Sequence, residues 1–280
     1  MPSPAAAHTK SERIESPQNR WFKRFRGALR GERSDNEPVL GLEGVRLVAD
    51  ALHTGLTLEA LLVSESGERH LARLKPLFPA GARVLRTTDR LFAAAADTET
   101  PQGIAALVRC HVWTWEDLLG SNALVVVLAG VQDPGNVGAI VRSADALNAS
   151  GVVACRGSAD PLGPKAVRAS AGSVLRLPVL ADSPPPKAVL DELRRRGVQQ
   201  YAATVSGERP PHGCDLSHPC ALWIGSEGAG LPAEIAAAAD ARIRIPLRSR
   251  VESLNAAAAA TILLYEASRQ RASAADGKTA

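Results

Sequence analysis

Apolar residues follow two different periods along this chain, and the two periods alternate. Near-continuous apolar runs such as ALVVVLAG at 123–130 and CALWIG at 220–225 are typical of strands buried on both faces of a parallel sheet. Between such runs, apolar residues recur every three or four positions, as in VGAIVRSADALN at 137–148, which predicts amphipathic helices. The pattern therefore predicts an α/β protein with helices packed on open sheets.

The front and rear parts of the chain each predict an α/β unit. In the front part the expected elements are helices over 41–55, 68–78 and 88–97 and strands over 58–64, 82–88 and 103–109, which make a small three-layer unit. In the rear part the expected strands cover 123–130, 151–156, 199–205, 220–225 and 241–246, and the expected helices cover 137–148, 164–173, 185–197, 231–240 and 254–271. Ligands of open α/β sheets bind outside the carboxyl ends of the strands, so the loops that follow the strands are the candidate sites.

Composition narrows the setting of the protein. No stretch of the sequence approaches the roughly 18 apolar residues that span a bilayer, and the N-terminus lacks the apolar middle of a secretory signal. The cysteines are too few and too scattered for a disulfide framework. They are Cys110, Cys155, Cys214 and Cys220. We expect a cytoplasmic protein that does not enter a membrane.

One short segment, PHGCDLSHPC, holds two histidines and two cysteines, which are the side chains that bind zinc. Its spacing is not that of the common zinc fingers, and Pro211 and Pro219 are typical of an ordinary loop before a strand. We therefore expect no metal site there.

Positive charge is concentrated near the N-terminus. The whole chain carries a formal net charge of +4, whereas Lys10 to Arg33 holds eight Lys or Arg against three Glu. Such local basic density favours binding to nucleic acid, and interleaved aromatic residues offer stacking surfaces for bases. The candidate contacts are Arg20, Lys23, Arg24 and Arg26, with Trp21, Phe22 and Phe25 between them. The alternative is an amphipathic helix that docks Trp21 and Phe25 on the body of the protein and leaves its charges solvated.

The first candidate loop follows the strand that ends at Gly130 and reads VQDPGNVGAIVRSADAL. Its Pro-Gly pair forces a turn, and Asn136 can cap a helix that begins near Val137. Arg142 then lies about two turns into that helix. An amide and a guanidinium beside free helix N–H groups suit a phosphate or a developing oxyanion, although a helix cap followed by a surface arginine explains the same residues.

The second candidate loop, IGSEGAGLPAEI, also lies between a strand and a helix. Gly225, Gly228 and Gly230 let the backbone approach a ligand closely, which favours a nucleotide-like ligand. The spacing is neither GxGxxG nor that of a phosphate-binding P-loop, and a GxSxG elbow is absent. Glu227 in such a loop is costly unless it has a partner or a function.

The third candidate loop leads into IPLRSRVESLNAAAAATILLYEASRQR. Ser253 is placed to cap the following helix, and Glu252 is favourable at the positive end of that helix. The alanines from Ala256 to Ala260 permit very close packing of the helix, either within the chain or at a subunit interface.

Taken together, these stretches resemble the three motifs of the SpoU/TrmH family of RNA 2′-O-methyltransferases, in the SPOUT superfamily. The matching segments are DPGNVGAIVRSADA, IGSEGAGL and IPLRSRVESLNAAAAATILLYE, in order, with PLGPKAVRASAGSVLRLPV between the first two. The front segments SPQNRWFKRFRGALR, GLEGVRLVADAL and TPQGIAALV are similar to the RNA substrate-binding domain of the family. The resemblance covers roughly residues 14–271.

The resemblance implies a fold and a division of the chain. It implies a rear α/β domain tied in a deep trefoil knot, a smaller front α/β domain that binds the RNA substrate, and a homodimer with the alanine-rich helix at its interface. The expected parts are a flexible leader over 1–12, a basic arm and substrate-binding domain over 13–109, a linker over 110–121, the catalytic domain over 122–272 and a flexible tail over 273–280.

The resemblance also implies the cofactor and the residue roles. S-adenosylmethionine would lie in the rear loops against Ala203, Thr204, Gly225, Gly230, Ile245 and Leu254. The catalytic set would be Arg142, Asn136, Glu227, Ser253 and Asn255, with Arg168 as a further RNA contact. A guanidinium holds its proton in proteins, so we expect Arg142 to bind phosphate and stabilise the developing alkoxide, on RNA bound mainly to the other subunit.

Two alternative functions have to be weighed, and the sequence does not identify the RNA substrate. An RNA-binding assembly factor without catalysis would lack motif residues that are all present here, and a nucleotide-dependent oxidoreductase would need a dinucleotide fingerprint. Ribosomal RNA is favoured over transfer RNA because the smallest transfer-RNA members of the family often lack a front domain. Methylation that confers antibiotic resistance stays open, as does the target nucleotide.

Overall fold

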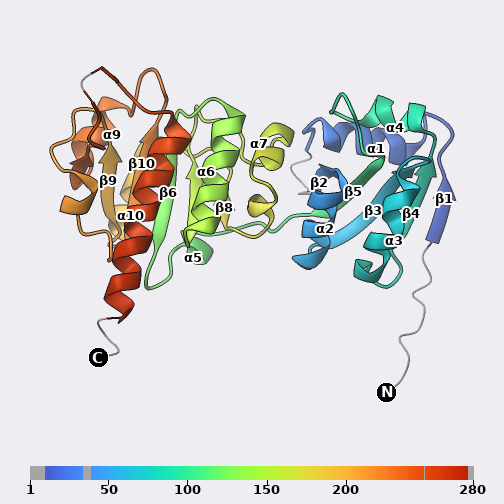
Figure 1. Cartoon of the computed structure of the whole chain (residues 1–280), viewed down its shortest axis with the longest axis horizontal. Helices are drawn as coiled ribbons and strands as arrows, with labels where there is room; N and C mark the ends of the chain where they lie inside the picture. The colour runs from blue at the N-terminus through green and yellow to red at the C-terminus, as the bar shows by residue number, and fades with distance from the viewer. Residues whose placement is uncertain (1–9, 34–38, 249, 277–280) are drawn as a thin grey trace. The chain divides into compact units, whose positions relative to one another are not determined.

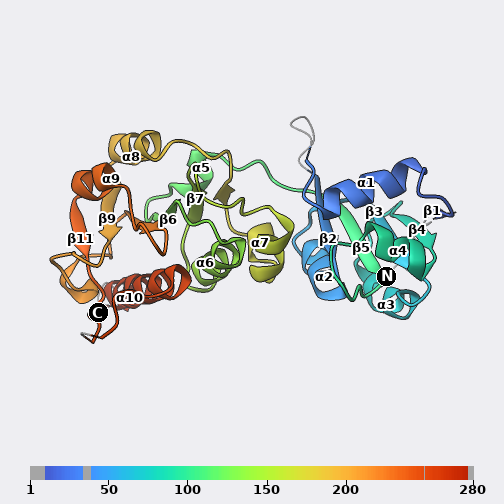
Figure 2. The same cartoon turned by 90° about the horizontal axis from the view of Figure 1, so that it is seen from above.

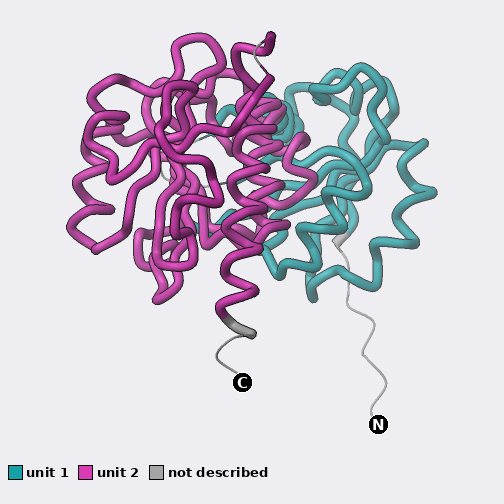
Figure 3. Tube along the Cα trace, turned by 60° about the vertical axis from the view of Figure 1, so that its left-hand side comes forward, with its two compact units in different colours: residues 1–112 teal, residues 113–280 magenta. Residues whose placement is uncertain are grey.

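The structure is a computed structural model that describes residues 10–33, 39–248 and 250–276. The chain divides into two compact units, unit 1 over residues 1–112 and unit 2 over residues 113–280 (Figure 3). Each unit has its own sheet and its own buried core. No helix in the described part of the chain is long and apolar enough to cross a membrane.

Unit 1 is built on a five-stranded mixed sheet in the order β1-β4-β3-β5-β2. The strands are β1 (Lys10–Arg13), β2 (Val39–Glu43), β3 (Thr57–Ser64), β4 (Arg83–Thr87) and β5 (Ile104–Arg109). Strands β1, β4 and β3 run parallel to one another, whereas β5 is antiparallel to both β3 and β2.

Helices cover both faces of this sheet (Figures 1 and 2). They are α1 (Arg20–Leu29), α2 (Val45–His53), α3 (Glu68–Leu74) with the short 3₁₀ helix η1 (Lys75–Leu77), and α4 (Asp89–Ala95). Helices α1 and α4 share one core through Phe22, Phe25 and Phe92, while α2 and α3 lie on the opposite face. The front unit therefore has three layers.

Two strands of unit 1 were not expected from the sequence. Residues 10–12, expected to belong to a flexible leader, are part of edge strand β1, and the rest of that leader lies outside the described residues. The helix expected over 41–55 was wrong at its start, because residues 39–43 form β2 and the helix begins only at Val45. A Cβ at Gly41 would lie 2.5 Å from the backbone of Ala28, so the glycine lets β2 lie directly against α1.

Unit 2 is built on a six-stranded sheet in the order β11-β9-β10-β6-β7-β8 in which every pairing is parallel. The strands are β6 (Leu124–Ala129), β7 (Gly151–Ala154), β8 (Val179–Leu180), β9 (Gln199–Ala203), β10 (Cys220–Gly225) and β11 (Ala241–Ile243). The central strands β6 and β10 are almost entirely buried, as their unbroken apolar runs predicted.

Helices also cover both faces of the second sheet (Figure 2). They are α5 (Trp115–Leu118), α6 (Pro134–Ala146), α7 (Pro164–Ala169), α8 (Pro186–Arg195), α9 (Ala233–Ala238) and α10 (Ala256–Asp276), with the 3₁₀ helices η2 (Ser173–Leu175) and η3 (Pro211–Gly213). Helices α5, α8 and α9 share a core around Trp223, and α6 and α10 pack on the other face. The indole N–H of Trp223 donates to Gln200 Oε1 at 2.9 Å.

Two boundaries differ from the expectation in unit 2. The expected linker over 110–121 contains helix α5, which is held by a capping box between Thr114 and Asp117. Helix α10 continues to Asp276, so the expected tail over 273–280 begins as helix, and residues 277–280 lie outside the described part.

Arg271 near the end of α10 joins three distant segments of unit 2. Its guanidinium donates to the carbonyl oxygens of Asn122 at 2.6 Å and Ala123 at 3.0 Å, just before β6. It also donates to the carbonyl oxygens of Leu216 at 2.9 Å and His218 at 2.7 Å, in the loop before β10. This side chain therefore satisfies carbonyl groups at the entry of two central strands.

Helices α6 and α7 approach each other closely at Gly138. A Cβ at this position would lie 2.3 Å from the carbonyl oxygen of Ala166 and 2.6 Å from Ala169 Cβ. We expect Gly138→Ala to lower the free energy of unfolding by about 1–3 kcal/mol through overpacking, as measured by urea denaturation. Gly120→Ala is the matched control because no atom lies within 4 Å of its added Cβ. An unchanged midpoint for Gly138→Ala would contradict this packing.

Candidate functional site

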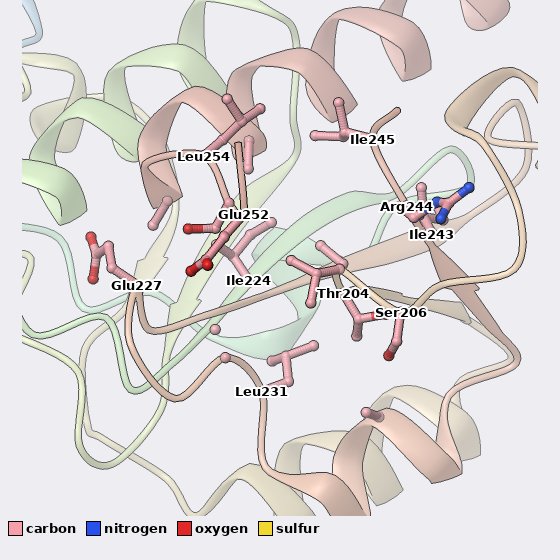
Figure 4. Close-up of a pocket in the computed structure, with 18 of the residues that line it drawn as sticks. Thr204, Ser206, Ile224, Glu227, Leu231, Ile243, Arg244, Ile245, Glu252 and Leu254 are labelled. Carbon is pink, nitrogen blue, oxygen red and sulfur yellow. The ribbon is translucent and has the colours of Figure 1, made fainter. Parts of the chain in front are cut away.

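A cavity of about 980 Å³ lies at the carboxyl ends of β9, β10 and β11 (Figure 4). Most of its wall comes from residues 203–206 after β9, residues 224–231 at the end of β10, and residues 242–248 and 251–254 before α10, and alanines of α9 and α10 complete it. The cavity is therefore at the place where an open parallel sheet is expected to bind a ligand.

The loop after β10 closes tightly on itself. Ser226 N–H donates to Gly230 O at 3.1 Å, Gly230 N–H donates to Ser226 O at 3.0 Å, and Ser226 Oγ accepts from Ala229 N–H at 3.1 Å. Gly230 has a φ of +68°, and a Cβ at Gly225 would lie only 2.2 Å from the carbonyl carbon of Gly230. Glycine at 225 is therefore required for the close approach that shapes this wall.

The structure brings all six expected cofactor residues to the same cavity. Ala203 and Thr204 come from the end of β9, Gly225 and Gly230 from the closed loop, and Ile245 and Leu254 from the segment before α10. Figure 4 shows Ile245 and Leu254 on the wall opposite Leu231. Their contact with a cofactor stays a prediction.

A chain of hydrogen bonds joins the three sequence motifs. The side-chain amide of Asn136, in the first turn of α6, donates to Glu227 Oε1 in the closed loop. Asn255 Nδ2 in turn donates to Asn136 Oδ1 at 3.0 Å, and Asn255 Oδ1 accepts from the N–H groups of Ala257 and Ala258 at 3.0 and 3.2 Å. The positions of the cavity loop, α6 and α10 are thereby coupled.

Both expected helix caps near this network were wrong. Helix α6 begins at Pro134, and its cap is Asp133, whose Oδ1 accepts from Gly135 N–H at 2.9 Å. This hydrogen bond and the nearby Lys165 lower the pKa of the Asp133 carboxyl. Asn136 is thus left to contact Glu227. The cap of α10 is Asn255 and not Ser253, which lies on the cavity wall instead.

Arg142 lies on α6, about two turns beyond Asn136. Its side chain is exposed, and it forms no hydrogen bond or ion pair within the described part of the protein. It is also outside the cavity wall. Of the five expected catalytic residues, Glu227 and Ser253 line the cavity, Asn136 and Asn255 are coupled to Glu227, and Arg142 is on the adjoining helix surface.

The basic segment of unit 1 forms α1, and its aromatic residues only partly fit the stacking hypothesis. Phe22 and Phe25 are buried in the core, so they cannot stack on bases. The alternative of docked aromatic residues holds for Phe25 and in part for Trp21, which packs against the same core. Trp21 is half-buried, with the guanidinium groups of Arg20 and Arg24 each 5.7 Å from its ring centre. Arg24 also pairs with Glu59 at 2.6 Å.

Four of the expected RNA contacts are exposed. Arg20, Lys23 and Arg26 project from α1, and Arg168 is on α7 of unit 2. Arg24 is half-buried and bound to Glu59, so its role includes holding α1 on the sheet. The basic residues of α1 belong to unit 1, whereas Arg168 belongs to unit 2.

The segment with two histidines and two cysteines is a loop around η3. Cys214 and Cys220 are buried, and burial raises the pKa of both thiols. The described residues contain no group of three or more side chains that could hold a metal ion.

Several cavity residues were not expected as site residues from the sequence, and Glu252 and Leu231 are the most informative of them. Glu252 was interpreted only as a favourable charge at a helix start, yet it lines the cavity (Figure 4). Leu231 supplies an apolar wall across from Ile245 and Leu254. A carboxylate two residues before Leu254 carried no signal of its own, because tertiary structure decides which residues before α10 lie along the cavity.

The cavity has the size and the groups to hold S-adenosylmethionine. Ligand sites of about 300–1,000 Å³ accommodate molecules of this size. Its wall combines apolar side chains with backbone groups, and Thr204 Oγ1 is buried with no hydrogen-bond partner among the described residues. The carboxylates of Glu227 and Glu252 suit a ligand that carries positive charge. The fold and cavity thus define an α/β domain that binds a nucleotide-like ligand beside an arginine-bearing helix.

Comparison with known proteins assigns the family. Residues 123–265 match the model of the SpoU rRNA Methylase family, and residues 29–106 match that of the MRM3-like substrate binding domain. The chain belongs to the SpoU rRNA methylase family.

Characterised relatives align with nearly the full length of the chain. The 23S rRNA (guanosine(2553)-2′-O)-methyltransferase RlmP of Bacillus subtilis is 34% identical over 256 residues, which cover 91% of this chain and 98% of the relative. An AdoMet-bound rRNA methyltransferase from Sinorhizobium meliloti has a TM-score of 0.78 and 31% identity, covering 92% of this chain and 98% of that one. The SpoU methyltransferase AviRb from Streptomyces viridochromogenes, in complex with AdoMet, has a TM-score of 0.79 and 30% identity, covering 91% and 99%.

Proposed function

We propose that this chain methylates the 2′-hydroxyl of a ribose in 23S rRNA, with S-adenosylmethionine as methyl donor. The observation that carries the proposal is the hydrogen-bonded chain Glu227–Asn136–Asn255, which couples the cavity to the helix that bears Arg142. RlmP is named as a 23S rRNA ribose methyltransferase, and two matching structures hold AdoMet.

The protein contributes binding and orientation at the donor side of the reaction. S-adenosylmethionine supplies an electrophilic methyl group on a sulfonium centre. Backbone at Gly225, Ile245 and Leu254 would hold it, and Thr204 Oγ1 would gain a hydrogen-bond partner. A cavity of this kind positions the donor beside the RNA hydroxyl.

Arg142 acts at the acceptor side. Its exposed guanidinium binds a phosphate of the RNA and stabilises the negative charge that develops on the ribose oxygen as it attacks. It does not serve as the base, because a guanidinium keeps its proton in proteins. The proton of the ribose hydroxyl would pass to solvent water as the oxygen gains the methyl group, and the donor would leave as a neutral thioether. Asn136 and Glu227 fix the approach of the ribose, while Ser253 and Asn255 hold the wall and the start of α10.

The same proposal includes the finer architecture. Residues 13–109 bind RNA, 110–121 connect the parts, and 122–272 carry catalysis. A trefoil knot in the rear domain is supported by the family resemblance and by the shared cavity of residues 224–231 and 244–254. A homodimer through α10 is supported by Ile262 and Tyr265, which are 39% and 61% exposed on that helix. A cytoplasmic location follows from the proposed ribosomal substrate.

Charge reversal on α1 tests the RNA-binding part of the proposal. We expect the double change Lys23→Glu and Arg26→Glu to weaken RNA affinity about tenfold or more at low salt, because phosphate contacts are lost. Filter binding at several salt concentrations should also show a shallower salt dependence. Arg46→Glu, on α2 at the opposite face of the sheet, is the control. Equal losses in both variants would remove α1 from the RNA-binding surface.

Mapping of ribose methylation tests the activity itself. Total RNA from cells with and without the gene is compared, and purified protein is titrated with S-adenosylmethionine in a calorimeter. We expect one 23S rRNA ribose to lose its methyl group in the deletion strain, and heat of binding from the purified protein. If a transfer RNA loses a methyl group instead, the proposed substrate would be that transfer RNA and not 23S rRNA. A folded protein with no binding heat would end the proposal and favour the inactive RNA-binding alternative.

A further inference from the structure

We propose that Glu252 gives the cavity a preference for the positively charged methyl donor over the neutral product. The inference rests on the proposed function, because it takes the cavity to be the donor site. It concerns a residue on the wall that has no assigned role in the transfer and that the sequence motifs explain only as a charge near a helix start.

The charged side chains of the cavity wall are not equivalent. Glu227 is engaged by the amide of Asn136, and Arg242 is paired with Glu208. Glu252, in contrast, forms no hydrogen bond or ion pair with any other described side chain. Its carboxylate is therefore available to a ligand.

The two carboxylates lie at one end of the cavity. Figure 4 shows Glu252 on the side of Glu227, whereas Arg244 lies toward the other end near Thr204 and Ser206. Arg248 also lines the cavity and is exposed to solvent. Two carboxylates are therefore present at the end where Asn136 and Asn255 join the cavity to α6.

The reacting sulfur has to lie at that same end. The acceptor ribose is bound beside α6, and in-line transfer requires donor and acceptor atoms to be about 3–3.5 Å apart. Glu252 precedes Asn255 by three residues in the segment that borders this end. We therefore assign this carboxylate to the sulfonium end of the donor and not to its adenosine end.

The donor and the product differ in charge at this one atom. S-adenosylmethionine has a sulfonium, while S-adenosylhomocysteine has an uncharged thioether and is otherwise alike. A carboxylate near the sulfur attracts the first and not the second. Because Glu252 is exposed in the free protein, solvent screens the attraction, and we expect a preference of roughly three- to tenfold.

Calorimetry on the full-length protein and Glu252→Gln tests the proposal with three ligands. They are S-adenosylmethionine, sinefungin, in which a protonated amine replaces the methylated sulfur, and S-adenosylhomocysteine. We expect the substitution to weaken the two charged ligands by roughly three- to tenfold and to leave the affinity for S-adenosylhomocysteine unchanged. Glu234→Gln removes an equal charge from α9 outside the cavity wall and should change none of the affinities.

The outcomes separate this inference from the proposed function. Equal weakening of all three ligands, or no change for any, would overturn the role of Glu252 while leaving the donor site intact. Absence of binding by the unsubstituted protein would instead contradict the proposed function. Thermal unfolding of Glu252→Gln, compared with the parent protein, ensures that an affinity change is not a loss of folded protein.

Discussion

Replacing Arg142 with alanine is expected to reduce turnover by about a hundredfold and to leave the affinity for S-adenosylmethionine unchanged. The guanidinium stabilises charge that develops only during transfer, and removal of one such donor costs about 10²–10³ in rate. Arg142 is outside the cavity wall, so the donor contacts stay in place. Single-turnover methylation measures the rate, and calorimetry measures the affinity.

Two further variants sharpen this prediction. Arg142→Lys keeps the charge but loses the planar fork that grips a phosphate, so it should recover only part of the rate. If Arg142 acts on RNA bound at the other subunit, mixed dimers of Arg142→Ala and Gly225→Ala subunits should regain activity, because one of the two sites is then intact. Loss of donor affinity in Arg142→Ala would contradict its assignment to the acceptor side.

The second large effect is expected from Gly225→Ala, which should abolish most donor binding and activity together. The added Cβ would lie 2.2 Å from the carbonyl carbon and 2.4 Å from the carbonyl oxygen of Gly230. The closed loop must therefore open, at a cost of about 1–3 kcal/mol, which corresponds to a loss of affinity of roughly fivefold to 150-fold. Calorimetric titration with S-adenosylmethionine measures the loss.

Gly120→Ala is the matched control outside the cavity wall. No atom lies within 4 Å of a Cβ added there, so the affinity for the donor should stay close to that of the parent protein. Similar weakening by both substitutions would contradict the argument from the Gly225–Gly230 contact.

Long apolar runs made most of the sheet of unit 2 predictable, but the two-residue edge strand β8 was not expected. Strands β6 and β10 are buried on both faces, so their sequences carry no competing polar pattern. The shorter strands of unit 1 were harder to predict. Strand β2 contains Gly41, which is needed because this position contacts the backbone of α1. Strand β1 has polar residues at its exposed positions. The local periodicity of apolar residues does not reveal either feature, because both depend on the tertiary structure.

The caps show how a correct set of residues can receive wrong local roles. Asp133 before Pro134 is a strong start signal, and it was passed over in favour of Asn136. Ser253 and Asn255 are both good caps, so sequence alone could not choose between them. In the folded chain, Asn136 meets a carboxylate 91 residues away and Asn255 meets an amide 119 residues away. These pairings depend on the topology of the sheet.

Aromatic residues in a basic segment were equally ambiguous. Phe22 and Phe25 alternate with exposed charges at helical spacing, and this pattern fits both a stacking surface and a core-facing stripe. In the structure both phenylalanines are buried in the core, because α1 covers one face of the sheet of unit 1. Lys23 and Arg26 are exposed, so the attraction of RNA phosphates by the charges of α1 stays a prediction.

The bonds of Arg271 have a consequence for the order in which a ribosome can finish this protein. Every strand and helix of unit 1 comes from the first 109 residues, so that unit can fold while the rest is still being translated. In contrast, Asn122 lies just before the first strand of unit 2, and its carbonyl accepts a hydrogen bond from the guanidinium of Arg271, which is 149 residues further along the chain. A nascent chain stalled before Arg271 has left the ribosome would therefore carry a finished first unit and an open second one.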